Sequence, residues 1–217
     1  MENDVKEFLS ELLKQLKSID YIKPEDIPNI DLYMDQVTTF MDEQLAASKR
    51  YESDKILTKT MINNYAKNNL LPSPDKKKYS KEHVLTLLFI YYFKNILSIN
   101  DIRSILNPLT EKYFGNDDGF TMQDVYTEVF SLEAEESQKL LKDLGKKYKI
   151  AGETFEDFPD EDQKFLHTFS FICMLSFDVY IKKMLIERMI DNLNEEKETS
   201  YHENTHSGKE SKKTGSN

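Results

Sequence analysis

Residues 61–80 read MINNYAKNNLLPSPDKKKYS and decide the fold, because an Asn-rich helical pattern passes directly into a proline-containing turn, three lysines and a tyrosine. The pattern predicts a helix over residues 55–68, with Ser53 or Asp54 as its N-cap. The side chains expected to face the core recur at helical spacing: Leu57, Met61, Ile62 and Tyr65.

The end of this helix and the turn that follows are also predicted. Asn69 stands where a left-handed residue often ends a helix, and Leu70-Leu71-Pro72 then stops it. Residues 72–78 are too short and too broken for a helix, which predicts a small hairpin or wing that ends at Tyr79.

A second face of the predicted helix is polar and net positive. Lys59, Asn63 and Lys67 lie at spacings of four residues, with Thr60 and Asn64 beside them. This row is the part of the helix that is free to contact a ligand.

Helices are predicted on both sides of this stretch. Helical spacing indicates an amphipathic helix over residues 2–17 and another near residues 32–47. Ser80 can cap a helix whose run at residues 83–93, HVLTLLFIYYF, is apolar nearly all round and is therefore expected to be covered on several sides. A short helix over residues 98–106 is predicted to end at the Asn-Pro pair that follows.

The C-terminal half has a different pattern. Two long helical regions are predicted, roughly over residues 121–147 and 159–193, followed by a disordered tail with almost no apolar residues. Residues 165–190 are predicted to be a core helix of a C-terminal bundle, and the apolar stretch at 165–181 is too short to favour a membrane span. A dimer seam and a ligand pocket between helices are the alternatives.

Composition and charge narrow the class of protein. The 217 residues are 39% hydrophobic with few Gly and Pro, which favours a mostly helical globular chain, and the single cysteine fits a reducing, cytoplasmic setting. The formal net charge is -10, yet residues 43–103 hold 11 Lys or Arg against six Asp or Glu. A positive module in an acidic chain is the footprint of contact with a polyanion, although lysine clusters are also ordinary solvated surface.

The run TMINNYAKNNLLPSPDKKKYSKEHVLTLLFIYYFKNILSINDIRSIL, within residues 30–107, resembles the winged-helix DNA-binding domain of MerR-type regulators. It is more closely similar to an uncharacterised bacterial family, domain of unknown function 1836, in which TKTMINNYAK, KKKYSKEH and the LSINDI element recur. The resemblance implies a winged helix-turn-helix with a small β wing.

Carried over by residue, the resemblance places Tyr65 on the second tyrosine of the recognition-helix motif and Tyr79 on the wing tyrosine. Asn63 and Asn64 replace the Arg-Tyr pair of the motif, which removes the usual contacts to the DNA backbone. Asparagine can instead pair bidentately with adenine. Asn69 replaces a glycine, a mild change because asparagine tolerates the left-handed conformation.

These observations assign roles to ten residues. Thr60, Asn63 and Asn64 are expected to face base edges in the major groove. Tyr65 and Tyr79 are candidates whose rings favour packing over phosphate contact. Five lysines are expected to contact phosphates: Lys59, Lys67, Lys76, Lys77 and Lys78.

Sharper chemical motifs are set aside. His202 to His206 spell the H-E-x-x-H zinc pattern, but they fall in the charged tail, and residues 114–125 fail as a calcium loop. His83 and His167 stand alone on apolar helices and are interpreted as core or edge residues, and Cys173 is interpreted as a small buried hydrophobic residue. We therefore expect no enzyme and no cofactor.

The sequence predicts a mostly α chain in four parts: an N-terminal helix and linker over 1–30, a winged helix over 31–107, an all-α dimerisation or effector region over 108–193, and a tail over 194–217. The predicted function is a cytoplasmic, homodimeric transcriptional regulator that binds double-stranded DNA, with a small-molecule or protein effector at the C-terminal helices and no membrane contact. The alternative is a winged-helix module that binds a protein partner without sequence-specific DNA binding.

Overall fold

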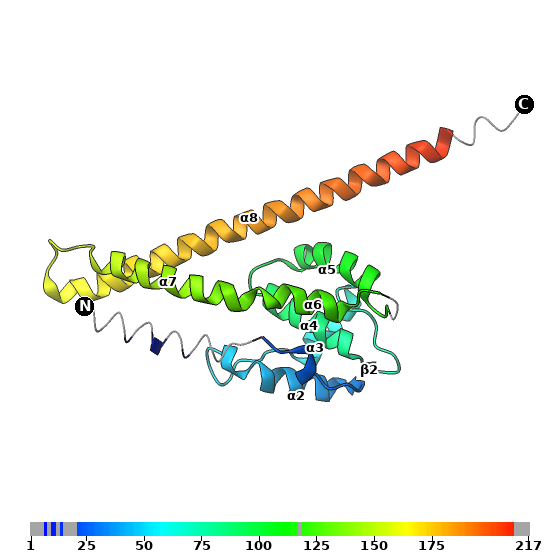
Figure 1. The fold of residues 1–217 in the computed structure, drawn as a ribbon, viewed down its shortest axis with the longest axis horizontal. Helices are drawn as coiled ribbons and strands as arrows, with labels where there is room; N and C mark the ends of the chain where they lie inside the picture. The colour runs from blue at the N-terminus through cyan, green and yellow to red at the C-terminus, as the bar shows by residue number, and fades with distance from the viewer. Residues whose placement is uncertain (1–6, 8–9, 12–13, 15–20, 117–118, 211–217) are drawn as a thin grey trace, which may run out of the picture.

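The computed structural model describes residues 21–116 and 119–210, together with residues 7, 10, 11 and 14. The helix predicted over residues 2–17 lies mostly outside the described residues. The described chain is mostly helical and contains a small two-stranded sheet, as Figure 1 shows.

The candidate region begins with the first of the two strands. The order is η1 (Pro24–Asp26), β1 (Leu32–Tyr33), α2 (Met34–Gln44), η2 (Ala46–Ser48), α3 (Lys59–Lys67), β2 (Lys78–Tyr79) and α4 (Lys81–Phe93). The two strands pair antiparallel, with Leu32 opposite Tyr79 and Tyr33 opposite Lys78. The segment predicted to be a small hairpin or wing is a turn that leads into β2, and β2 pairs with β1, the segment before α2.

Helix α4 is the centre of the core. Its residues from His83 to Tyr91 are all buried, as the nearly all-apolar run predicted. Ser80 precedes α4 as its N-cap, and its backbone N–H donates to Nδ1 of His83 at 3.0 Å. The neighbouring helices cover α4 with buried side chains, which include Val37, Met41, Ile62, Tyr65, Ile102, Leu106, Met122 and Tyr126.

The C-terminal helices extend away from this core. They are α5 (Ile99–Tyr113), α6 (Met122–Ser131), α7 (Glu133–Gly152) and α8 (Asp160–Glu210). In Figure 1, α7 leads away from the core, the chain turns, and α8 returns past α5 and continues beyond the core. Among the described residues, no helix has the length and apolarity needed to cross a bilayer.

Several predicted helix boundaries are wrong. Helix α3 begins at Lys59 with Thr58 as its cap, four residues later than predicted, because Ile56 and Leu57 are buried in a non-helical segment before it. Helix α5 continues through Pro108, since a proline costs one backbone hydrogen bond and buried Ile102 and Leu106 hold the helix in place. The region at 121–147 divides at Leu132 into α6 and α7.

Helix α8 also differs from its prediction, in length and in burial. It continues to Glu210, through residues assigned to a disordered tail, because Glu and Lys favour helix and no Gly interrupts it before Gly208. Phe165, Phe169 and Ile172 are more than half exposed, so the prediction of a core helix at 165–190 is wrong. Cys173, expected to be buried, is exposed.

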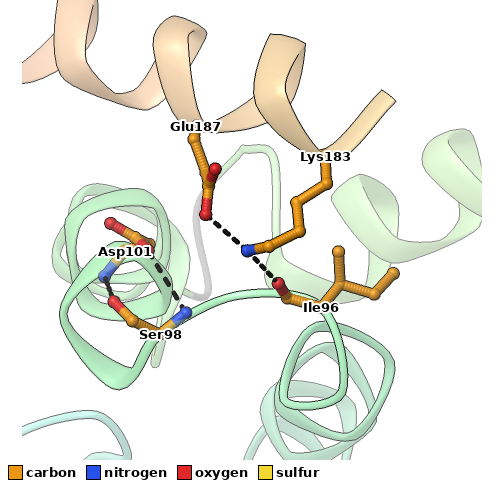
Figure 2. A network of polar contacts seen from close by, with 5 residues as sticks. All are labelled: Ile96, Ser98, Asp101, Lys183 and Glu187. Atoms are coloured by element: carbon orange, nitrogen blue, oxygen red, sulfur yellow. Dashed lines mark hydrogen bonds and ion pairs between the residues drawn. The ribbon is translucent and has the colours of Figure 1, made fainter. Parts of the chain in front are cut away.

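A polar contact joins α8 to the core. The Nζ of Lys183 donates to the backbone carbonyl of Ile96 at 2.9 Å and forms an ion pair with Glu187, one turn further along α8. Figure 2 shows this carbonyl in the loop between α4 and α5, beside the cap formed by Ser98 and Asp101 at the start of α5. The position of α8 is thus tied to the loop that precedes α5.

Candidate nucleic-acid interface

Helix α3 presents the predicted polar row to solvent. Thr60, Asn63, Asn64 and Lys67 are all exposed, while Ile62 and Tyr65 are buried beneath them. The Oγ1 of Thr58 accepts a hydrogen bond from the backbone N–H of Met61 at 3.2 Å and starts the helix. Two exposed asparagines are thereby held side by side on a rigid element.

The segment before α3 is fixed by a lysine that the sequence pattern did not single out. The Nζ of Lys94, in the loop after α4, donates to the carbonyl of Ile56 at 2.7 Å. Burial lowers the pKa of Lys94. This contact positions the N-terminal end of α3 against α4.

Lys59 is not a free cation. Its ammonium forms an ion pair with Asp35 in the first turn of α2. Both side chains are mostly exposed, so the pair is weak and a phosphate could displace the carboxylate. The predicted phosphate contact of Lys59 would therefore compete with an acidic neighbour.

The C-terminal end of α3 is held by a second basic residue that sequence reasoning missed. The Nε of Arg103 on α5 donates to the carbonyl of Asn68 at 3.0 Å, and Asn68 donates through its side chain to the carbonyl of Asn64 at 2.7 Å. Asn69 has φ 55°, as the prediction of a left-handed helix end required. Arg103 lies 35 residues from Asn68, which no local pattern could reveal.

The lysines of the predicted wing, residues 76–78, lie in a tight turn. The backbone N–H of Lys78 donates to the carbonyl of Asp75 at 2.8 Å, and the two central residues, Lys76 and Lys77, have φ of 46° and 66°. Positive φ at both centres is typical of a type I′ turn, in which Asn-Gly is the favoured pair. Both lysines are exposed, so the tip of the wing carries two cations on a strained backbone.

Lys78 is half-buried, and its ammonium lies 5.5 Å from the ring centroid of Tyr33 on β1. This is a cation–π contact that fixes the lysine at the base of the wing. Of the three wing lysines, Lys76 and Lys77 are therefore the ones that are free to reach a phosphate.

Tyr65 and Tyr79 are both buried and belong to the core, in line with the preference for packing. Burial raises the pKa of each phenol. The ring of Tyr79 packs edge-on against His83, with centroids 5.5 Å apart. Neither ring is available to a nucleic acid.

We also considered metal sites and surface recesses as candidate sites. Within the described residues, no group of three or more His, Cys, Asp or Glu side chains could hold a metal ion. A recess at the junction of α7 and α8 is lined by Tyr148, Gln163, Lys164 and His167, and the Nε2 of His167 lies 2.8 Å from the carbonyl of Thr154. We assign no ligand to this recess.

Comparison with known proteins gives one match. Residues 22–129 match the model of a family described as "Domain of unknown function (DUF1836)". No protein with a curated description matches the chain, and neither does any solved structure. The match begins just before η1 and ends within α6, so it includes the segment that carries the candidate interface.

Proposed function

We propose that residues 31–107 bind double-stranded DNA and that the chain acts as a transcriptional regulator in the cytoplasm. The observation that supports this best is the pairing of an exposed Asn-rich face on α3 with the exposed Lys76 and Lys77 at the tip of the wing. An exposed helix of this width fits the major groove of B-form DNA. The wing then lies beside the groove, where the phosphates are.

The two halves of this interface have different tasks. Asn63 and Asn64 carry both donors and acceptors, so they suit base edges, and an asparagine amide pairs bidentately with N6 and N7 of adenine. Lys67, Lys76 and Lys77 suit phosphates, which position the protein without reading sequence. Arg103 is a further cation at the C-terminal end of α3.

The acidity of the rest of the chain supports a DNA interface that is limited to the basic region. The net charge of -10 repels DNA everywhere except near residues 43–103, where basic residues exceed acidic ones. Contact with DNA is thereby directed to one end of the molecule.

The test is a salt titration of binding to random duplex DNA by the full chain. Each phosphate contact contributes a slope of about 0.9 in a plot of log affinity against log salt, so the double variant Lys76→Gln with Lys77→Gln is expected to lower the slope by about 2. Lys142→Gln with Lys149→Gln, two exposed lysines on α7, is the matched control and should leave the slope unchanged. No binding at low salt, or equal slopes in both double variants, would overturn the proposal.

A second candidate function is a protein-binding module on the same architecture. It is favoured by the ion pair of Lys59 with Asp35, which places a carboxylate at the start of the proposed DNA face. Absence of DNA affinity for both the chain and its Asp35→Asn variant would favour this alternative.

A further inference from the structure

Helix α8 carries a row of apolar side chains, here called the seam, and the solvent exposure of these side chains differs along the helix. Phe165, Phe169, Ile172, Ser176 and Val179 follow one another at spacings of four and three residues, the spacing of a helix-pairing seam. The four apolar members are 70%, 52%, 53% and 62% exposed, in chain order. They form a stripe over residues 165–179, about 21 Å long at 1.5 Å per residue.

One side of this part of α8 is occupied by α7. Phe171 packs edge-on against Tyr148 of α7 with ring centroids 5.4 Å apart, and Asp178 forms an ion pair with Lys147 of α7. The seam therefore lies on the side of α8 turned away from α7. Monomeric proteins rarely expose an apolar stripe of this size without a partner.

Further along α8 the same spacing continues through Lys183, Ile186 and Ile190. There Lys183 donates to the carbonyl of Ile96, Ile186 is 37% exposed, and Ile190 is 3% exposed in the hydrophobic core. The core of the chain thus contacts the seam at Lys183 and Ile190, whereas the apolar residues of its first half are all more than half exposed. We call residues 165–179 the open seam.

The charges at the two ends of the open seam are of opposite sign. Asp160, Glu161 and Asp162 precede it and are exposed, and Lys182 and Lys183 follow it. An antiparallel partner with the same sequence would bring the acidic end of one helix to the basic end of the other. A parallel partner would place like charges together, which is unfavourable.

We propose that a second copy of this chain docks on the open seam, with the two α8 helices antiparallel and a two-fold axis near Ile172. In this register Ile172 meets Ile172 of the second copy, Phe165 meets its Val179, and the large ring of Phe169 meets the small Ser176. Glu161 then lies beside Lys182 of the second copy. Large side chains face small ones and each acid faces a base, so the seam is complementary to itself.

The first test is the oligomeric state of the full chain by sedimentation velocity over a range of concentrations. Ile172→Glu is expected to weaken the dimer by more than about 100-fold, because two carboxylates would face each other in an apolar seam. Leu185→Glu is the matched control, since Leu185 is 58% exposed on another side of α8 and its change should leave the dimer intact. Far-ultraviolet circular dichroism checks that both variants keep their helices.

The second test reports on direction and register. In a Cys173→Ser background, Ile172→Cys should form an intermolecular disulfide, because residues at the two-fold axis approach within the range that a disulfide spans. A mixture of Glu161→Cys and Lys182→Cys chains should join only as mixed dimers with a short thiol cross-linker. Cross-linking of each variant to itself would show a parallel pair and overturn the proposal.

Two further outcomes of the sedimentation experiment would overturn the proposed dimer interface. A wild-type chain that stays monomeric at high concentration, or a dimer that Leu185→Glu dissociates and Ile172→Glu does not, excludes the open seam as the interface. These measurements use no DNA, so failure of the proposed DNA binding leaves their result unaffected.

Discussion

At the residue scale, the turn at residues 75–78 holds Lys77 in a backbone conformation that lowers the stability of the fold. Lys77 has φ 66°, a conformation that costs a residue with a Cβ about 1 kcal/mol more than it costs glycine. Local strain that is retained in a native structure is commonly found where the side chain has a function.

We therefore expect Lys77→Gly to raise the free energy of unfolding by about 0.5 to 1 kcal/mol and to weaken DNA binding. Urea unfolding measures the first effect, and binding to random duplex DNA at low salt measures the second. Lys67→Gly, at the last residue of helix α3, is the contrasting variant, because the backbone there is helical and glycine relieves no strain. An unfolding free energy of Lys77→Gly below that of the wild type would contradict this account of the turn.

His83 is a second residue whose environment has a measurable consequence. Its ring is buried between Tyr79 and Phe114, and its Nδ1 accepts a hydrogen bond from the backbone of Ser80, which requires the neutral ring. Burial lowers the pKa of His83, while the nearby carbonyls of Ser73 and Pro72 and the carboxylate of Asp31 act in the opposite direction.

The pH dependence of stability follows from this direction. Below pH 6.5 the unfolded chain binds a proton at His83 more readily than the folded chain does, so the free energy of unfolding should fall as the pH falls from 6.5 toward the lowered pKa. His83→Gln removes this titration and keeps a side chain that can accept the Ser80 N–H. Urea unfolding between pH 7.5 and about 5 should show a smaller slope for the variant. Identical slopes would assign the pH dependence to other groups.

At the scale of elements, the sequence predicted well those features that are determined locally. The apolar run of α4, the buried face of α3 and the left-handed Asn69 all follow from short-range patterns, and all are present. The boundaries depended on distant contacts. Lys94 and Arg103 hold the two ends of α3 from α4 and α5, and no pattern within α3 indicates them.

The burial of α8 could not be predicted for a related reason. An apolar stripe looks the same in a sequence whether the chain itself or another molecule covers it. Phe169 and Ile190 belong to the same seam, yet one is 52% exposed and the other 3% exposed. Only the placement of α8 against the core distinguishes them.

The contact between α8 and the core yields a prediction at this scale. Lys183→Met keeps the apolar stem and removes the ammonium that donates to the carbonyl of Ile96 (Figure 2). Because Lys183 is partly exposed, the loss of stability should stay below about 1 kcal/mol. Amide hydrogen exchange should quicken in the first turn of α5, and the exposed Arg188→Met serves as the control that leaves it unchanged. Unchanged exchange in Lys183→Met would mean that the apolar contacts alone hold α8 in place.

At the scale of the whole molecule, the two proposals together set a distance. Lys183 anchors the core to α8 eleven residues beyond Ile172, so in the proposed dimer 22 helical residues separate the two anchors along the helix direction. At 1.5 Å per residue this is about 33 Å. One turn of B-form DNA is about 34 Å, the separation at which two symmetric DNA-binding domains meet successive major grooves on one side of the duplex.

We therefore expect the dimer to protect two half-sites whose centres lie about 10 base pairs apart and whose sequences are related by two-fold symmetry. The measurement is hydroxyl-radical footprinting on duplexes selected in vitro with the full chain. Ile172→Glu should retain contact with a single half-site at reduced affinity, because residues 31–107 stay folded while the second copy is lost. Two protected regions at a spacing other than one turn would contradict the antiparallel register, whereas no protection at low salt would contradict DNA binding itself. The two proposals can therefore fail separately, and the spacing between protected regions tests how they combine.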